Sequence, residues 1–241
     1  MPALRIGTCG WSLAQGAYFA RFSAIEIQNT FYEPPQLATA RRWRQAAPPG
    51  FAFAVKVWQL VTHPSTSPTY RRLKTHLDET ALRECGYFQL TPAVEMALVR
   101  TLEVAEALGA QALLFQTPAS FAPEERFIRN LRAFFRAHPP AATRLCVWEP
   151  RGPWPEGLVG ELCRELGLVH GVDPFAARPA TRGTAYFRLH GIGGYRHRFT
   201  DAELDRLASE IRQRLEAQED VWCFFNNVTM ADDAARLAAR L

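Results

Sequence analysis

The sequence predicts a (β/α)8 barrel, in which eight parallel strands form a closed sheet surrounded by helices. Eight short apolar runs, rich in β-branched and aromatic residues, recur along the chain. Helical patterns separate most of them, and strands that alternate with helices favour a parallel sheet covered by helices. The chain has 241 residues, which suits one barrel of about 250 residues. We therefore expect a single domain over residues 1–241.

The predicted strands are short and are bounded by glycine, proline or polar residues. An open, doubly wound sheet is the main alternative, but no GxGxxG motif follows the first run, which argues against a dinucleotide-binding sheet. The eight runs cover residues 4–9, 24–29, 51–58, 112–116, 145–149, 168–173, 185–190 and 221–226.

Amphipathic segments fill most of the intervals between these runs. Residues 203–215 place aliphatic side chains on one face behind a Thr200–Glu203 capping box. The connections after the first and sixth runs are short, and we expect no more than a turn of helix in each. The other predicted helices cover residues 36–46, 93–108, 124–137, 156–166 and 229–240.

Composition narrows the class of protein. No apolar run reaches the roughly 18 residues that a membrane span requires, and the N-terminal residues lack the layout of a signal peptide. The five cysteines are scattered without CxxC spacing, which is typical of reduced thiols in a cytoplasmic protein. The chain is arginine-rich: of 28 basic residues only Lys56 and Lys74 are lysines. A lysine retained in such a sequence suggests a role for its deprotonatable amine.

Alternation along the strands predicts which side chains enter the barrel. In residues 51–58, Phe51, Phe53, Val55 and Val57 share the face suited to the helices, and Lys56 lies on the opposite face. Several other strands likewise carry a polar residue near their C-terminal end, opposite the larger apolar stripe. In a barrel that opposite face is the interior, and its C-terminal end opens into the active site.

The predicted mouth therefore collects polar side chains from several strands. Buried charges are costly unless they are paired. Consecutive strands are neighbours in a barrel, so we expect Glu26 to pair with Lys56. A second expected pair joins Glu149 to Arg188. The collected residues are Glu26, Asn29, Lys56, His63, Gln116, Glu149, Arg151, Asp173, Arg188, His190 and Asn226 or Asn227.

The stretch VWEPRGPW at 147–154 illustrates this pattern. Val147 and Glu149 are predicted to face the interior, Val147 in the packed layers and Glu149 at the rim. Arg151 begins the following loop, and Trp154 is predicted to form a wall of the cleft.

Seven segments resemble the YecE-like family, also called domain of unknown function 72, and most closely a branch with archaeal and thermophilic members. The resemblance implies a TIM-barrel fold but no established activity. Two departures stand out: the loop after the first strand looks shorter than usual, and CGW replaces the common SGW, so no serine nucleophile is expected there. The segments are IGTCGWS (6–12), IEIQNTFYEPP (25–35), FAFAVKVWQLVTHP (51–64), LLFQTPASF (113–121), WEPRGPW (148–154), YFRLHG (186–191) and VWCFFNNV (221–228).

The first functional hypothesis is an enzyme that acts on a small anionic or sugar-like molecule by general acid–base catalysis, as a hydrolase, lyase or isomerase. Glu149 and His190 are the candidates for proton transfer, with Lys56 and Glu26 as further catalytic candidates. Lys56, Arg151 and Arg188 would bind phosphate or carboxylate groups. The remaining predicted substrate-binding residues are Asn29, Tyr32, His63, Gln116, Trp154, Asn226 and Asn227.

Two chemical variants of this hypothesis remain open. No cofactor is required by the sequence, but Glu149, Asp173 and His190 come from adjacent strands and could converge on a divalent metal ion. No HxH or HExxH spacing supports that metal site. A Schiff-base role for Lys56 is also chemically open, although pairing with Glu26 would raise the pKa of the amine and oppose it.

Two other classes of function remain. A nucleic-acid-binding or nucleic-acid-processing protein, with or without a divalent metal ion, is one: its arginines could contact phosphates and its aromatic residues could stack bases. Against it, the net charge is only +4 and arginine-rich helix faces are usually just solvated. A non-catalytic ligand-binding barrel is the third functional hypothesis. The residues that favour nucleic acid are Arg41, Arg42, Arg44, Arg71, Arg72, Arg196, Arg198, Trp11, Tyr32, Trp58 and Trp154.

Overall fold

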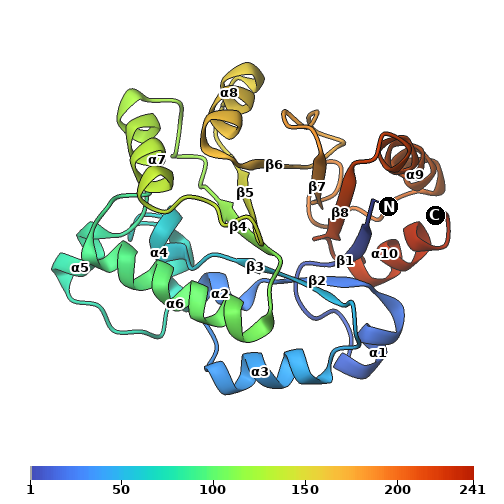
Figure 1. Ribbon diagram of the computed structural model, residues 1–241, viewed down its shortest axis with the longest axis horizontal. Helices are drawn as coiled ribbons and strands as arrows, with labels where there is room; N and C mark the ends of the chain where they lie inside the picture. Colours follow the sequence, from blue (N-terminus) through green and yellow to red (C-terminus); the bar gives the residue numbers. More distant parts are fainter. Residues whose placement is uncertain (1) are drawn as a thin grey trace.

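A computed structural model describes residues 2–241, and its eight parallel strands form a nearly closed barrel with helices around it (Figure 1). The strands are hydrogen-bonded in the order β1-β8-β7-β6-β5-β4-β3-β2. This is the predicted TIM barrel. The strands are β1 Leu4–Thr8, β2 Ala24–Ile27, β3 Ala52–Lys56, β4 Ala112–Gln116, β5 Leu145–Glu149, β6 Val169–Val172, β7 Thr184–Leu189 and β8 Asp220–Phe225.

The seam between β1 and β2 is held by few direct contacts. The backbone N–H of Gly10 donates to the carbonyl of Glu26 at 2.8 Å. The Tyr18 hydroxyl bridges the two strands, because it accepts from the Thr8 N–H at 2.9 Å and donates to the Ala24 carbonyl at 3.0 Å. A Cβ at Gly7 would lie 1.9 Å from the Ala24 carbonyl oxygen. Only glycine permits this close approach of the strands.

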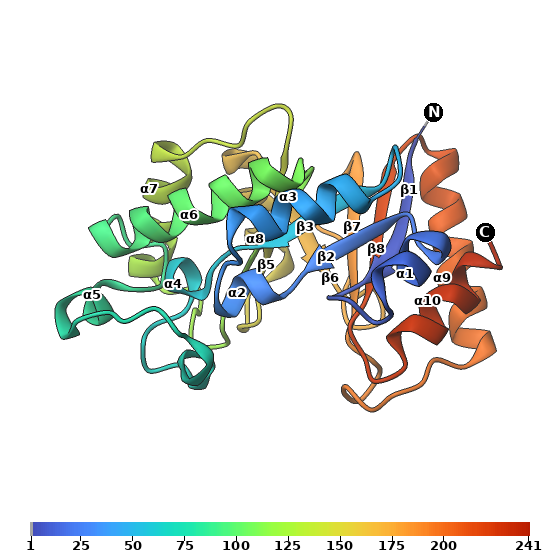
Figure 2. The same ribbon diagram turned by 90° about the horizontal axis from the view of Figure 1, so that it is seen from below.

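The helices lie outside the sheet, and α10 packs against both β1 and β8, so the last helix covers the first strand (Figure 2). Thr200 and Glu203 form the predicted capping box. The main helices are α1 Gln15–Arg21, α3 Leu37–Ala46, α6 Pro92–Leu108, α7 Glu125–Ala137, α8 Glu156–Leu166, α9 Asp201–Glu216 and α10 Met230–Ala238. Short helical pieces are α2 Asn29–Tyr32, α4 Gln59–Thr62, the 3-10 helix η1 Pro68–Arg72 and α5 Glu79–Glu84.

The connection after β1 holds more helix than the sequence predicted. Helix α1 has seven residues, about two turns, instead of the single turn expected. Its Tyr18 is fully buried and supplies the bridge at the seam, which gives the longer helix a structural role. Within residues 2–241, no helix is long and apolar enough to cross a membrane.

Two apolar clusters fill the fold. The larger one lies between the strands and the helices and includes Phe53, Val55 and Phe187. The smaller one fills the barrel interior, where alanines from β2, β3 and β4 occur together with large side chains from β7 and β8. The predicted faces of β3 and the predicted interior position of Val147 on β5 are therefore confirmed. The interior cluster consists of Cys9, Ala24, Ala52, Ala54, Ala112, Leu114, Val147, Tyr186, Trp222 and Phe224.

Candidate active site at the C-terminal ends of the strands

Arg188 on β7 joins the two buried carboxylates of the barrel mouth. Its side chain is 0% exposed. Its Nε and Nη2 donate to the Glu26 carboxylate on β2, at 3.0 Å to Oε2 and 2.8 Å to Oε1. Its Nη1 donates to Oε2 of Glu149 on β5. One guanidinium therefore crosses the barrel interior and confirms the predicted pair with Glu149, since its fork of donors can bind two carboxylates.

Tyr186 completes the environment of Glu26. Its hydroxyl donates to Glu26 Oε2 at 2.7 Å, and the Gln28 amide also donates to this carboxylate. Burial, with Glu26 as the second cause, raises the pKa of Tyr186 well above its ordinary value, so the phenol remains a donor. Tyr186 is absent from the residues predicted for the site, although its position two residues before Arg188 on the same strand face signals that it points inward.

Lys56 on β3 does not form the ion pair that the sequence predicted. Glu26 binds Arg188 instead, whereas Lys56 Nζ donates to Gln116 Oε1 at 2.7 Å and lies 3.9 Å from the centre of the Phe31 ring. Burial and, next, the positive charge of Arg188 lower the pKa of Lys56 from 10.5 to about 7. The expectation was wrong because it considered only neighbouring strands, and Arg188 reaches Glu26 across the barrel.

Glu149 forms the link between this buried network and the rim. Its Oε1 lies 2.9 Å from Arg151 Nη2 and 3.2 Å from His190 Nε2. Burial alone would raise the pKa of Glu149, but Arg188 and Arg151 lower it well below its ordinary range. The Glu149 side chain is therefore a carboxylate at neutral pH.

His190 is fixed on three sides. Its backbone N–H donates to Asp173 Oδ2 at 2.9 Å, and its Nδ1 lies 3.1 Å from the Asn226 amide nitrogen. Its Nε2 contacts Glu149 Oε1 and the guanidinium nitrogens of Arg151 and, at 3.4 Å, Arg188. Because a guanidinium can only donate, these contacts favour a lone pair on Nε2 in the neutral His190. Burial lowers the pKa of His190 despite its contact with Glu149, so the imidazole is neutral at pH 7.

A pocket of about 220 Å³ opens beside these groups, between the ends of β5 and β6. Glu149, Arg151, Trp154 and Asp173 contribute to its lining. The Trp154 indole donates to the Phe121 carbonyl at 2.6 Å and stacks on the Phe121 ring. A Cβ at Gly171 would lie 2.8 Å from a methyl group of Val147, so a larger residue there would crowd the side chains of the barrel interior.

His63 is buried and, like Lys56, contacts the ring of Phe31. Its Nδ1 contacts the Thr62 hydroxyl at 2.8 Å, and its ring packs edge-on against Phe31. Burial and then the nearby charge of Lys56 lower its pKa to about 3. His63 is therefore a neutral neighbour of the lysine.

Three other predicted residues lie away from this cluster. Asn227 donates to Asp233 Oδ2 and to the His197 carbonyl, both at 2.7 Å, at the start of α10. Asn29 and Tyr32 line a separate groove of about 780 Å³. The Tyr32 ring lies 3.5 Å from the Arg72 guanidinium.

The proposed metal-binding trio does not converge on a common point. The carboxylate of Asp173 accepts from the backbone N–H groups of His190, at 2.9 Å, and Phe175, at 3.0 Å. Across residues 2–241, no group of three or more His, Cys, Asp or Glu side chains is placed to bind a metal ion.

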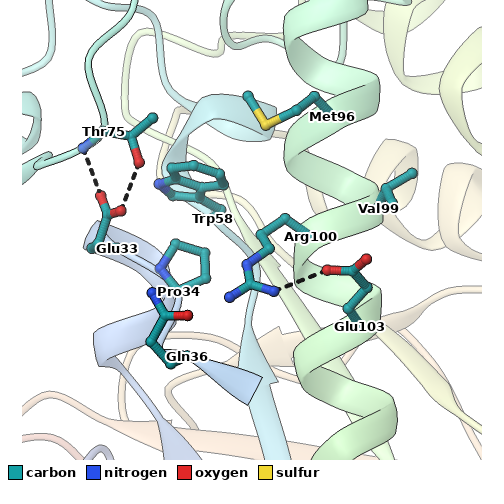
Figure 3. A pocket seen from close by; sticks show the side chains of 9 residues that line it. All are labelled: Glu33, Pro34, Gln36, Trp58, Thr75, Met96, Val99, Arg100 and Glu103. Carbon is teal, nitrogen blue, oxygen red and sulfur yellow. Dashed lines mark hydrogen bonds and ion pairs between the residues drawn. The ribbon is translucent and has the colours of Figure 1, made fainter. Parts of the chain in front are cut away.

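A further hollow of about 510 Å³ lies between α6 and the segment that follows α2 (Figure 3). Its charged groups are already paired: Glu33 accepts from the Thr75 hydroxyl at 2.6 Å, and Arg100 donates to Glu103 at 2.9 Å. The predicted catalytic and substrate-binding residues do not line it, although Trp58 from the residues that favour nucleic acid does. We therefore place the candidate site at the barrel mouth.

The comparisons with known proteins agree with this architecture. The family described as "Protein of unknown function DUF72" matches residues 5–241. The chain belongs to the DUF72 family. A DUF72 protein from Enterococcus faecalis superimposes with a TM-score of 0.74 at 17% identity, over 99% of this chain and 97% of the other. A DUF72 protein from Thermotoga maritima gives 0.71 at 19% identity, over 98% of each chain.

Structures outside the DUF72 family also match. Endonuclease IV from Thermus thermophilus superimposes with a TM-score of 0.54 at 12% identity, over 99% of this chain and 97% of the other. At these identities the likeness shows the TIM-barrel fold alone. Comparison with curated proteins found no match. The activity must therefore be argued from the site itself.

Proposed function

We propose that this DUF72 protein is an enzyme that acts on a small anionic or sugar-like substrate by general acid–base chemistry at the barrel mouth. The observation that carries this proposal is the buried Glu26–Arg188–Glu149 network at the C-terminal ends of the strands. Active sites of TIM barrels lie at that end. Buried charges with perturbed pKa values are costly to stability and cluster at functional sites.

In this proposal, His190 is the general base. Its imidazole is neutral at pH 7, and it faces the ionised Glu149, which stabilises the imidazolium formed when His190 accepts a proton. Asn226 fixes the ring orientation. Glu149 thus orients and stabilises His190 and does not itself transfer a proton, because its pKa is too low for that task.

Arg151 is the candidate anion-binding group. Its side chain is 36% exposed and contacts Glu149 through Nη2. A guanidinium has five donors, so most of them remain for a phosphate or carboxylate on the substrate. The half-exposed Gln116 and Asn226 would orient hydroxyl groups.

A thermal-shift screen of phosphorylated, carboxylated and neutral sugars and small acids tests the proposal. We expect anionic compounds to stabilise the wild type and to lose most of this effect in Arg151→Gln. The His190→Gln variant should retain binding of the same compounds but not their conversion, followed by NMR of the mixture. Compounds that stabilise Arg151→Gln as well as the wild type would contradict the proposed role of Arg151.

One structural feature favours nucleic-acid binding as a second candidate function. The groove beside η1 combines Arg71, Arg72 and Lys74 with the rings of Tyr32 and Trp43, and such a surface can bind phosphates and stack bases. Binding of a single-stranded oligonucleotide should then weaken steeply with added salt. A salt-independent affinity, or unchanged binding by Arg71→Gln, would exclude this groove as the binding surface.

A further inference from the structure

Lys56 is a buried amine without an acidic partner. Its side chain projects from the last residue of β3 into the barrel mouth and is 7% exposed. Among the ion pairs within residues 2–241, those of Glu26 and Glu149 go to Arg188, Arg151 and His190, and Lys56 takes part in none. Its neutral partner Gln116 is half-exposed, so the amine lies one side chain below the surface of the mouth.

The groups around Lys56 favour a neutral amine. Burial and, next, Arg188 on β7 lower its pKa, whereas Glu149, Glu26 and Cys9 act in the opposite direction without restoring the ordinary value. His63 also faces it but is uncharged. Phe31 covers one side of the amine, and this contact with the ring face favours the protonated form, as the carboxylates do. A desolvated lysine beside another cation is the arrangement that activates an amine as a nucleophile.

We infer that Lys56 is the nucleophile of an imine-forming site, and that the substrate is an aldehyde or ketone carrying a phosphate or carboxylate group. The inference deepens the function proposed above and rests on the same mouth. Arg151 would bind the anionic group, while Lys56 Nζ reacts with the carbonyl carbon. Gln116, which now accepts from Nζ, would hold the amine in place before the reaction.

The reaction balances without an oxidant or a metal ion. The nitrogen lone pair of Lys56 attacks the carbonyl carbon, a C–N bond forms, and the C=O π electrons move to oxygen, which takes up a proton as nitrogen loses one. The resulting carbinolamine then expels its oxygen as water, and nitrogen loses its second proton. The products are an imine on Lys56 and one water molecule.

The chain offers an internal control, because Lys56 and Lys74 are its two lysines and Lys74 is exposed. The full-length protein is incubated at pH 7 with glycolaldehyde phosphate and sodium cyanoborohydride. The reagent is oxidised as it delivers hydride to the imine carbon, and nitrogen takes a proton from water. Peptide mass spectrometry then locates the secondary amine. Lys56→Arg keeps a cationic side chain but removes the nucleophile, and Lys74→Arg is the matched control.

We expect labelling of Lys56 to exceed that of Lys74 by about 500-fold. About half of an amine with a pKa near 7 is neutral at pH 7, against roughly one in a thousand for an ordinary lysine. The Lys56 adduct should persist in Lys74→Arg. In Lys56→Arg the adduct on lysine side chains, located by peptide mass, should fall to the low level of Lys74. Equal labelling of the two lysines, or labelling of Lys74 alone, would overturn the inference.

Ethyl phosphate, which has no carbonyl group, separates this inference from the proposed function. If it stabilises the wild type but not Arg151→Gln, and no Lys56 adduct forms, the anion site stands and the imine chemistry is refuted. If a Lys56 adduct forms but ethyl phosphate stabilises neither protein, the imine chemistry stands and the anion site is refuted. If ethyl phosphate stabilises neither protein and no Lys56 adduct forms, both the anion site and the imine chemistry are refuted.

Discussion

Arg188 binds both buried carboxylates of the barrel mouth, whereas Lys56, on the same inner surface, donates to the neutral amide of Gln116. The positive charge of the Arg188 guanidinium is thereby balanced by two carboxylates, whereas no carboxylate within residues 2–241 pairs with the Lys56 amine. Burial first, and the charge of Arg188 second, lower the pKa of Lys56. Glu149 connects the buried network to His190 and Arg151 at the rim. The following predictions test these contacts separately.

Replacing Arg188 should strongly destabilise the fold. In Arg188→Met, Glu26 and Glu149 lose their shared partner while they remain buried, which should cost about 3–5 kcal/mol. Urea unfolding at pH 7 measures the change. Arg151→Met is the control: it removes a partly exposed partner of the same Glu149, and its cost should stay within about 1 kcal/mol. Equal losses of unfolding free energy in the two variants would show that burial does not make the contacts of Arg188 stronger than the contact of Arg151.

Removing the hydroxyl of Tyr186 tests the contact with Glu26 alone. Tyr186→Phe keeps the buried ring but loses a hydrogen bond to a charged group, which should cost about 1.5–3 kcal/mol of unfolding free energy. Tyr195→Phe is a suitable control, since Tyr195 is 59% exposed, and it should change stability by less than about 0.5 kcal/mol. A stability of Tyr186→Phe equal to that of the control would contradict the role of the hydroxyl.

The contribution of Glu149 should depend on pH. Its pKa in the folded chain is lowered from the ordinary 4.5, so the stability it adds is present above that value and is lost as pH falls toward the folded pKa. The advantage of the wild type over Glu149→Gln should therefore shrink when unfolding is measured below pH 4.5 instead of at pH 7. The exposed Glu216→Gln serves as the control. A difference that stays constant with pH would argue against an ionised Glu149.

Lys56 should produce the opposite pH dependence. Its pKa falls from 10.5 to about 7 on folding, so the unfolded chain binds its proton more tightly. The resulting loss of stability is largest below pH 7 and disappears as pH approaches 10.5. The unfolding free energy of Lys56→Met should therefore exceed that of the wild type by the largest amount at pH 7 or below. This gain should shrink by up to about 1.4 kcal/mol per pH unit above pH 7, measured by urea unfolding. A gain that does not change between pH 7 and 9 would refute the shifted pKa.

The fold could be predicted from the sequence because each strand carries local signals. In β3, Phe53 and Val55 face the helices, while Ala54 and Lys56 face the interior, as alternation requires. The seam between β1 and β2 could not be predicted in this way. It depends on a hydroxyl bridge from Tyr18 and on the close approach of the backbone at Gly7 to the neighbouring strand. Both depend on how separate elements are placed in three dimensions, which a local sequence pattern does not reveal.

The candidate site could be located, but its contacts could be predicted only in part. The pair of Glu149 with Arg188 was predicted, yet Glu26 and Arg188 lie 162 positions apart and meet across the barrel interior. A rule about neighbouring strands cannot give that contact. Asn226 and Asn227 follow β8 as adjacent alternatives, and the structure directs Asn226 to His190 and Asn227 to Asp233.

The proposed function depends on recognition of an anion by Arg151, and a ligand titration followed by melting temperature tests this most directly. The stabilisation of the wild type should grow with the concentration of the best anionic compound, reaching about 2.7 kcal/mol at 100 times its dissociation constant. The same titration of Arg151→Gln should give a much smaller shift, and the neutral analogue should give little with either protein. Equal stabilisation of both proteins, or by the neutral analogue, would contradict an anion-binding site at the barrel mouth.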